Sequence, residues 1–209
     1  MSTWDCPRPG VGKPTGGDND PMPQIVLIRH GETPWSATGR HTSRTDVDLT
    51  PAGEDQARAI GERLAGRSFA AVWCSPRRRA ARTAELAGLA VTAVDDDLAE
   101  WDYGDYEGIT TAEIRATRPD WSLWTDGAPG GESPEQITVR VDRLLARVRP
   151  LLTADADVAL VSHGHLLRVL GARWGGLPAS AGAILALDTG TLCELGVEHA
   201  SPVIQRWNA

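Results

Sequence analysis

The sequence has little lysine and no paired cysteines. Lys13 is the only lysine among 21 basic residues, so any anion site must be built from arginine, histidine and backbone N–H groups. The three cysteines, Cys6, Cys74 and Cys193, are far apart and form no CxxC pair. This spacing argues against a disulfide framework or a zinc knot, and it predicts reduced thiols in a cytoplasmic protein.

Long apolar runs and excess positive charge are also missing. No apolar run reaches the roughly 18 residues of a membrane-spanning helix, and the N-terminus lacks the apolar core of a signal peptide. The formal net charge is −7, which argues against a nucleic-acid or membrane partner. Residues 1–23 are rich in Gly, Pro and Asp and are expected to form a disordered tail, and residues 24–209 a single domain.

The rest of the chain alternates strand-like and helix-like segments. Short apolar runs predict buried strands at 25–28, 70–75 and 157–162, and each is followed by a helical pattern. This alternation predicts an α/β fold, a three-layer α/β/α sandwich with a mostly parallel central sheet.

Helix starts are marked by specific capping signals. Thr50 followed by Pro51 predicts a helix that begins there. Capping boxes at 110–113 and 133–136 predict two more, and residues 164–174 read as the helix after the third strand.

The C-terminal segment predicts antiparallel strands at a sheet edge. We expect residues 183–198 to form a hairpin that turns near Gly190, with a last strand at 203–206. The apolar edge at 183–195 suits either pairing with a second copy, which gives a homodimer, or cover by the tail.

Three of the predicted strands end in polar residues. The first ends in Arg29 and His30, the second in Ser75 followed by the arginines 77–79, and the third in Ser162 and His163. Ligands of open α/β sheets bind beyond the carboxyl ends of parallel strands. If the three strands are neighbours, two imidazoles and two guanidiniums meet at one spot.

This constellation suits a phosphate monoester. Arg29 and Arg79 can neutralise the phosphate charge through bidentate forks. Neutral His30 can attack phosphorus and form a phosphohistidine, while His163 holds the transferring oxygens. An acid for the leaving group can come from the loop 98–108. Its carboxyl groups are packed among aromatic residues, which favours a protonated form. Spacing alone does not select among Glu100, Asp102, Asp105 and Glu107.

Five motifs in fixed order carry a family resemblance. The segments RHGET, SPRRRAARTA, LAEWDYGDYEG, GGES and VSHGH resemble the histidine phosphatase superfamily, also called phosphoglycerate-mutase-like, from Ile25 to about Trp174. The resemblance implies that His30 is the phosphorylated nucleophile and that Glu100 is the proton donor. It also implies that Gly31 keeps the turn after the nucleophile tight.

The resemblance extends to the rest of the pocket. Arg29 and Arg79 match the phosphate-binding arginines, and His163 matches the second histidine. An Asn commonly follows the first motif in the family's phosphate pocket, and Ser36 stands there in this chain. The substrate contacts that we assign are Ser36, Thr42, Ser43, Tyr103 and Gly164.

The family contains phosphatases and mutases. Mutases bind the substrate carboxylate through extra basic residues after the acid-bearing loop, but here that segment has only Arg115 and Arg118, with Trp121 and Trp124. We therefore predict a phosphatase that acts on small phosphomonoesters or sugar phosphates without metal or organic cofactor, with a phosphoglycerate mutase as the alternative. The Trp residues suit a pocket cap or simple core packing.

A metal-dependent hydrolase is the remote alternative. His163 and His165 are spaced as a metal pair, but a catalytic zinc site needs three protein ligands, and neither an HxHxD nor an HExxH pattern occurs.

Because the proposed acid must start protonated, we expect activity to favour mildly acidic pH.

Overall fold

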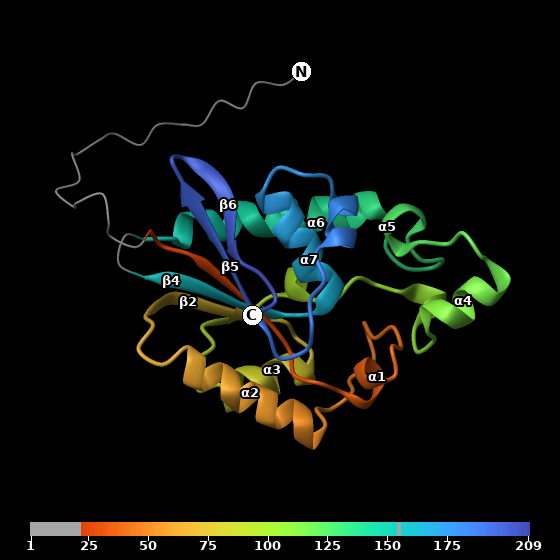
Figure 1. Cartoon of the computed structure of the whole chain (residues 1–209), viewed down its shortest axis with the longest axis horizontal. Helices are drawn as coiled ribbons and strands as arrows, with labels where there is room; N and C mark the ends of the chain where they lie inside the picture. Colours follow the sequence, from red (N-terminus) through yellow and green to blue (C-terminus); the bar gives the residue numbers. More distant parts are fainter. Residues whose placement is uncertain (1–21, 154–155) are drawn as a thin grey trace.

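The computed structural model describes residues 22–153 and 156–209, so nearly all of the expected tail lies outside the described residues. A six-stranded sheet in the order β3-β2-β4-β1-β5-β6 runs through the molecule (Figure 1). Neighbours from β3 to β1 pair in parallel, and β5 and β6 are antiparallel at one side. The strands are β1 (Ile25–Arg29), β2 (Phe69–Cys74), β3 (Ala93–Val94), β4 (Asp157–Ser162), β5 (Leu192–Glu198) and β6 (Ser201–Arg206).

Helices cover both faces of the sheet, which confirms the predicted three layers. In Figure 1, α6 and α7 lie above the sheet and α2 and α3 below it. The helices are α1 (Pro34–Ala37), α2 (Pro51–Arg63), α3 (Arg78–Leu86), α4 (Thr111–Thr117), α5 (Leu123–Asp126), α6 (Pro134–Val148) and α7 (Gly164–Trp174). Short 3-10 turns are η1 (Asp96–Leu98), η2 (Gly104–Tyr106), η3 (Arg149–Leu151) and η4 (Ala179–Ile184). No helix in the described ranges is long and apolar enough to cross a membrane.

The core consists of two apolar layers, one on each face. Successive residues of a strand point to opposite faces, so Ile25 and Leu27 join the cluster under α6 and α7, whereas Val26 and Ile28 join the cluster over α2 and α3. All four side chains are fully buried. This explains why the strand reads as an unbroken apolar run, which is typical of a parallel strand covered on both sides.

The predicted helix starts are confirmed by their caps. The Thr50 side chain accepts from the N–H of Gly53 at the start of α2. Both capping boxes are present, with Thr110 before α4 and Ser133 before α6. These signals depend on residues within one turn, so they can be read from sequence without knowledge of tertiary contacts.

The expected hairpin around Gly190 is wrong. Residues 185–191 form no strand and follow η4, and the actual hairpin joins β5 to β6 through His199 and Ala200, both with left-handed φ angles of 48° and 65°. The segment 183–195 is also not a free edge, because β5 lies between β1 and β6. Association of two copies therefore stays an untested prediction.

Candidate active site

The three polar strand tips lie side by side. β4 is flanked by β1 and β2, with Arg29 level with Ser162 and Cys74 level with Val161. The first residues after these strands therefore emerge together at one edge of the sheet. The predicted convergence is confirmed as a placement: the rings of His30 and His163 lie 5.0 Å apart, centroid to centroid.

His30 follows β1 and is held in one tautomer. Its Nδ1 lies 2.7 Å from the carbonyl oxygen of Gly31, and because a carbonyl can only accept, Nδ1 carries the proton. Nε2 therefore carries the lone pair of the neutral ring. The side chain is buried with 5% exposure, and it borders the cavity described below.

Gly31 fixes the backbone after His30 by close packing. A Cβ on Gly31 would lie 2.2 Å from the carbonyl oxygen of Gly53 in α2, and a Cβ on Gly53 would lie 2.1 Å from the carbonyl oxygen of Glu32. Gly31 has no left-handed φ. Its requirement for glycine therefore comes from this contact between two backbones, and not from the turn conformation expected from the sequence.

Arg29 is partly buried beside His30. One terminal nitrogen donates to the carbonyl of Leu187, and its Nε has no partner among the described residues. Gly164, the first residue of α7, leaves room for this guanidinium, because a Cβ there would lie 3.2 Å from the Arg29 Cζ. Gly164 does not border the cavity, so its visible part is to admit Arg29.

Arg79 and His163 lie next to His30 and are fully buried. The Arg79 Nε donates to Nδ1 of His163 over 3.2 Å, and the His163 Nε2 lies 2.7 Å from the Ser75 hydroxyl. An Nδ1 that accepts leaves the proton on Nε2, which then donates to Ser75. The terminal nitrogens of Arg79 donate to carbonyls of Thr42, Ser43 and Thr45.

Glu100 caps the first turn of α7 from another part of the chain. Its Oε1 accepts from the backbone N–H of Trp101 and Leu166, at 2.9 and 2.8 Å, and its Oε2 accepts from that of His165, at 3.1 Å. The N–H groups of His165 and Leu166 are orphan N–H groups at the start of α7, which favour a negatively charged partner. The bonds hold Glu100 at the edge of the cavity, where the sequence predicted a proton donor.

A cavity of about 190 Å³ opens onto these groups. Of the predicted site residues, His30, Arg29, Glu100, Ser36, Thr42 and Tyr103 border it. Arg79 and His163 lie behind His30, and Ser43 and Gly164 are not brought to it. The cavity also has a wall formed by Thr33, Gly39, Arg40, His41, Thr111 and His165. Of these residues, the sequence pointed only to His41, which suited either a substrate contact at the pocket mouth or a solvated surface position.

The hydroxyl groups predicted to contact substrate are mostly engaged elsewhere. Ser36 donates to the carbonyl of Thr33 within the capping box of α1. Thr42 donates to the carbonyl of Arg40, and buried Ser43 donates to a Glu107 carboxylate oxygen over 2.5 Å. The structure thus gives Ser43 and Glu107 a role in fixing the loop.

Burial and positive charge keep both facing histidines neutral. Burial, then the charges of Arg79 and Arg29, hold the pKa of His30 well below 6.5. Burial and Arg79 do the same for His163. Burial also lowers the pKa values of both arginines, although a guanidinium stays charged at any ordinary pH. The site is therefore a pair of neutral imidazoles among fixed cations.

The segment after the acid-bearing loop does not bring its arginines to the cavity. Arg115 donates to the carbonyl of Trp121 and Arg118 to the Tyr106 hydroxyl. Trp121 is buried in the core, and Trp124 packs against it. Of the two readings left open for these Trp residues, core packing is the one seen. The rings of Trp124 and His165 also lie near each other, with their centroids 5.3 Å apart.

The His163 and His165 side chains do not form a shared chelate. His163 bonds with Arg79 and Ser75, whereas His165 bonds with Tyr103. Within the described ranges no group of three or more His, Cys, Asp or Glu side chains is arranged to hold a metal ion. The sequence offered a signal for His165, since it is the second residue of a helix that begins at the site, but its tyrosine partner is 62 positions away.

The chain belongs to the histidine phosphatase superfamily (branch 1), whose family model matches residues 25–209. This confirms the resemblance that the five motifs indicated. It also makes the chain a member of an enzyme family.

Similar proteins include phosphatases of two kinds. An acid phosphatase of Mycobacterium tuberculosis is 46% identical over 178 residues, covering 84% of this chain and 87% of the relative. A sedoheptulose 1,7-bisphosphatase of Saccharomyces cerevisiae is 36% identical, with 74% and 68% covered. A solved structure of an open reading frame product of M. tuberculosis superposes with a TM-score of 0.86 at 44% identity, covering 89% of this chain and 97% of that one.

Proposed function

We propose that this chain is a metal-independent phosphatase that hydrolyses small phosphomonoesters, sugar phosphates among them, through a phosphohistidine on His30. One observation carries the proposal. A neutral imidazole with a free Nε2 lone pair lies between the partly buried Arg29 and the fully buried Arg79, while Glu100 is the only acidic side chain among the described residues that border the cavity. A phosphate dianion supplies the charge that this site lacks.

The first half-reaction transfers the phosphoryl group to the enzyme. With the ester phosphate in the cavity beside Arg29, and with Arg79 and His163 next to His30, the His30 Nε2 attacks phosphorus and the ester P–O bond breaks. Glu100 gives its proton to the leaving oxygen. Oε2 accepts one backbone bond and Oε1 two, so Oε2 is the oxygen with room for this proton.

The second half-reaction returns the enzyme to its starting state. Glu100, now a carboxylate, takes a proton from a water molecule that attacks phosphorus, the N–P bond breaks and phosphate leaves. Because the pKa of His30 lies well below 6.5, the nucleophile stays neutral in mildly acidic solution. The acidic preference expected from Glu100 is therefore compatible with this nucleophile.

A mutase would need an additional anchor for the substrate carboxylate. Arg115 and Arg118 make their bonds away from the cavity, so the phosphatase reading is favoured.

The two described cysteines, Cys74 and Cys193, are free and buried. Reduced thiols are in keeping with a cytoplasmic location, which we propose together with a small-molecule substrate.

The test is phosphate release from a panel of esters in EDTA. The panel contains p-nitrophenyl phosphate, sugar phosphates, sugar bisphosphates and 3-phosphoglycerate, with 2-phosphoglycerate monitored in the same tubes. We expect metal-independent release, lost by at least about 10⁴-fold in kcat in His30→Ala. The matched control is His199→Ala, at the exposed tip of the β5–β6 hairpin.

Three outcomes would contradict the proposal. Isomerisation of 3-phosphoglycerate with little free phosphate would make the chain a mutase. A requirement for a metal ion would contradict the proposed metal-independent mechanism. A phosphoenzyme trapped on His30→Ala would assign the nucleophile to another residue.

A further inference from the structure

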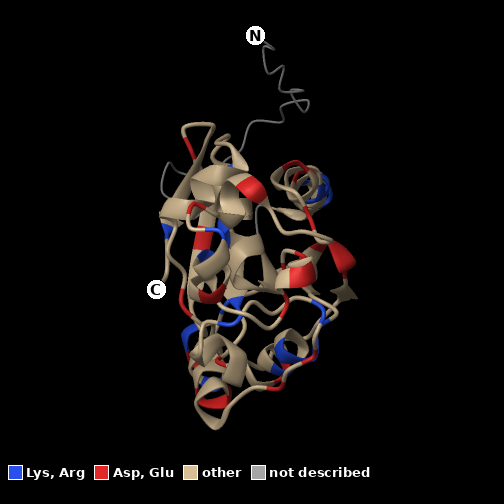
Figure 2. Ribbon diagram, turned by 90° about the vertical axis from the view of Figure 1, so that its right-hand side faces the viewer, with Lys and Arg blue, Asp and Glu red and all other residues tan. Residues whose placement is uncertain are grey.

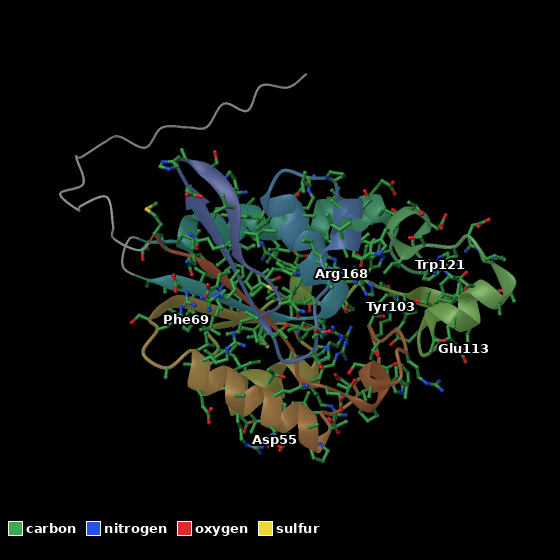
Figure 3. The ribbon with its side chains drawn as sticks, viewed as in Figure 1. Asp55, Phe69, Tyr103, Glu113, Trp121 and Arg168 are labelled. Carbon is green, nitrogen blue, oxygen red and sulfur yellow. The ribbon has the colours of Figure 1, made fainter. Side chains whose placement is uncertain are left out.

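His165 is a partly buried histidine that the proposed reaction does not use. It borders the cavity, and its Nδ1 lies 2.6 Å from the Tyr103 hydroxyl. Figure 3 shows Tyr103 on the side of the molecule where α4 and α5 lie, with Trp121 and Arg168 nearby. His165 is thus tied on one ring nitrogen while the ring forms part of the cavity wall.

The direction of the Tyr103 bond fixes the His165 tautomer. Burial, then Arg168 and His41, hold the pKa of His165 well below 6.5, so the ring is neutral and carries one proton. Burial also raises the pKa of Tyr103, which keeps its hydroxyl protonated. If Nδ1 donated instead, the buried Tyr103 hydroxyl proton would have no acceptor in the described part of the chain, so we assign the hydroxyl as the donor to Nδ1. The His165 proton is therefore on Nε2.

The Nε2–H group is free and accessible. Within residues 22–153 and 156–209, the buried side-chain nitrogen or oxygen atoms without a hydrogen-bond partner are the Nε atoms of Arg29 and Arg77. His165 Nε2 also has no partner there, but it is not among these buried atoms. It is therefore exposed, and it is reached from the cavity that His165 borders. The neighbouring hydroxyls are already committed. Thr42 donates to a carbonyl, and Thr111 bonds with the ring of His41.

We propose that His165 is a specificity-determining residue whose Nε2–H binds a hydroxyl oxygen of the leaving group. The substrate class is then a phosphate ester whose alcohol carries further hydroxyl groups, such as a polyol or sugar phosphate. The inference rests on the proposed function. Tyr103 is a positioning residue here, since it acts on the substrate through His165.

The position of His165 keeps this donor separate from the acid. Its backbone N–H donates to Oε2 of Glu100, and that bond does not depend on the side chain. A substitution of the ring therefore changes the cavity wall while it preserves the backbone bond that holds Glu100.

Two substitutions separate the two ring nitrogens. In His165→Asn the amide reaches the place of Nδ1, so it can accept from Tyr103 but offers nothing at Nε2. In His165→Gln the longer amide reaches the place of Nε2 and can donate into the cavity. The readout is the ratio of kcat/KM for glycerol 1-phosphate to that for 1-propyl phosphate, two esters with the same carbon chain and different hydroxyl content.

We expect the wild-type protein to prefer the glycerol ester by about ten-fold, the value of one well-placed hydrogen bond. His165→Asn should bring the ratio close to one, and His165→Gln should restore most of it. An unchanged ratio in His165→Asn, a ratio in His165→Gln as low as in His165→Asn, or no preference in the wild type overturns the inference.

Phosphate release from p-nitrophenyl phosphate by the wild type is measured in parallel. Release from that ester without a glycerol preference removes this inference alone. If the wild type releases phosphate from none of the three esters, the proposed function fails and the inference falls with it.

Discussion

The two ends of the parallel strands treat arginine in opposite ways. At the amino ends, Arg67 donates to Asp157 over 2.9 Å, to Glu194 over 2.5 Å and to Gln24 over 2.7 Å. Burial opposes its charge, but the bonds to Glu194 and Asp157 outweigh burial and raise the pKa of Arg67. Here a cation is matched by carboxylates on the neighbouring strands.

At the carboxyl ends, Arg29 and Arg79 have no ion pair with a carboxylate in the described part of the chain. They donate to backbone carbonyls and to the His163 ring, and burial lowers the pKa of both. A carbonyl offers a partial charge only, so these sites retain positive potential. The comparison teaches that the same residue type forms ion pairs at one end of the sheet and, in the proposed function, serves anion binding at the other.

Figure 2 shows basic and acidic residues interspersed over the ribbon on the side facing the viewer. The unbalanced positive charge is thus a local property of the strand tips and not of this surface. Four changes test the contrast, from the largest expected effect to the smallest.

Replacement of Arg79 by Met should break the carboxyl-end site. The variant loses a buried charge that stabilises the transferring phosphoryl group, so kcat/KM for p-nitrophenyl phosphate should fall by about 10³-fold. The control is Arg78→Met, because Arg78 is exposed and paired with Asp46 and Asp48. Equal losses in the two variants would mean that the arginine run acts through general charge and that Arg79 has no special place.

Acid should weaken the carboxyl-end site through its histidines. The folded-state pKa values of His30 and His163 lie well below 6.5, so the unfolded chain binds more protons below that pH. The unfolding free energy should then fall with falling pH below about 6.5, by up to about 3 kcal/mol per pH unit from these two groups. Urea unfolding between pH 7 and 5 measures the slope.

Inorganic phosphate sharpens the same measurement. A bound anion offsets the cations around both rings and should reduce the slope. A slope that phosphate leaves untouched would place the proton uptake outside the site.

Replacement of Arg67 by Met should break the amino-end network. Asp157 then remains partly buried without its cation and Glu194 keeps only Arg206, at 3.5 Å, so we expect a loss of about 2–3 kcal/mol in unfolding free energy. Turnover of p-nitrophenyl phosphate should stay within about two-fold of wild type, since Arg67 lies at the opposite end of the strands. Loss of turnover in the folded variant would undermine the division between the two ends.

Replacement of Ser75 by Ala should have the smallest effect. The change removes the acceptor for the His163 Nε2–H, worth about 1 kcal/mol, so kcat/KM should fall by about five-fold. Ser75→Thr, which keeps a hydroxyl, is the matched variant and should recover most of the activity. A Ser75→Ala enzyme as active as wild type would show that His163 holds its orientation without this bond.

Local signals explain what could be predicted from the sequence. Caps at Thr50, Thr110 and Ser133 involve partners within three residues, and the strand tips follow from a rule about parallel sheets. The positions of His30 and His163 could therefore be anticipated before any contact was known.

The wrong or missing assignments depend on distant partners. The hydroxyl of Ser43 is taken by Glu107, 64 positions along the chain. His165 owes its tautomer to Tyr103, and the segment around Gly190 is placed by backbone bonds to His30 and Arg29. No periodicity or turn signal encodes such contacts, so a hairpin there was a reasonable but incorrect reading.

The contact between Gly31 and Gly53 has a consequence for engineering the enzyme. The loop after His30 packs directly against the backbone of α2 at this contact. Neither glycine has a side chain that could be trimmed to move the loop. Residues of the opposite cavity wall, such as Arg40 and Thr111, belong to other segments. Substrate preference can thus be redesigned on that wall while the nucleophile keeps its place.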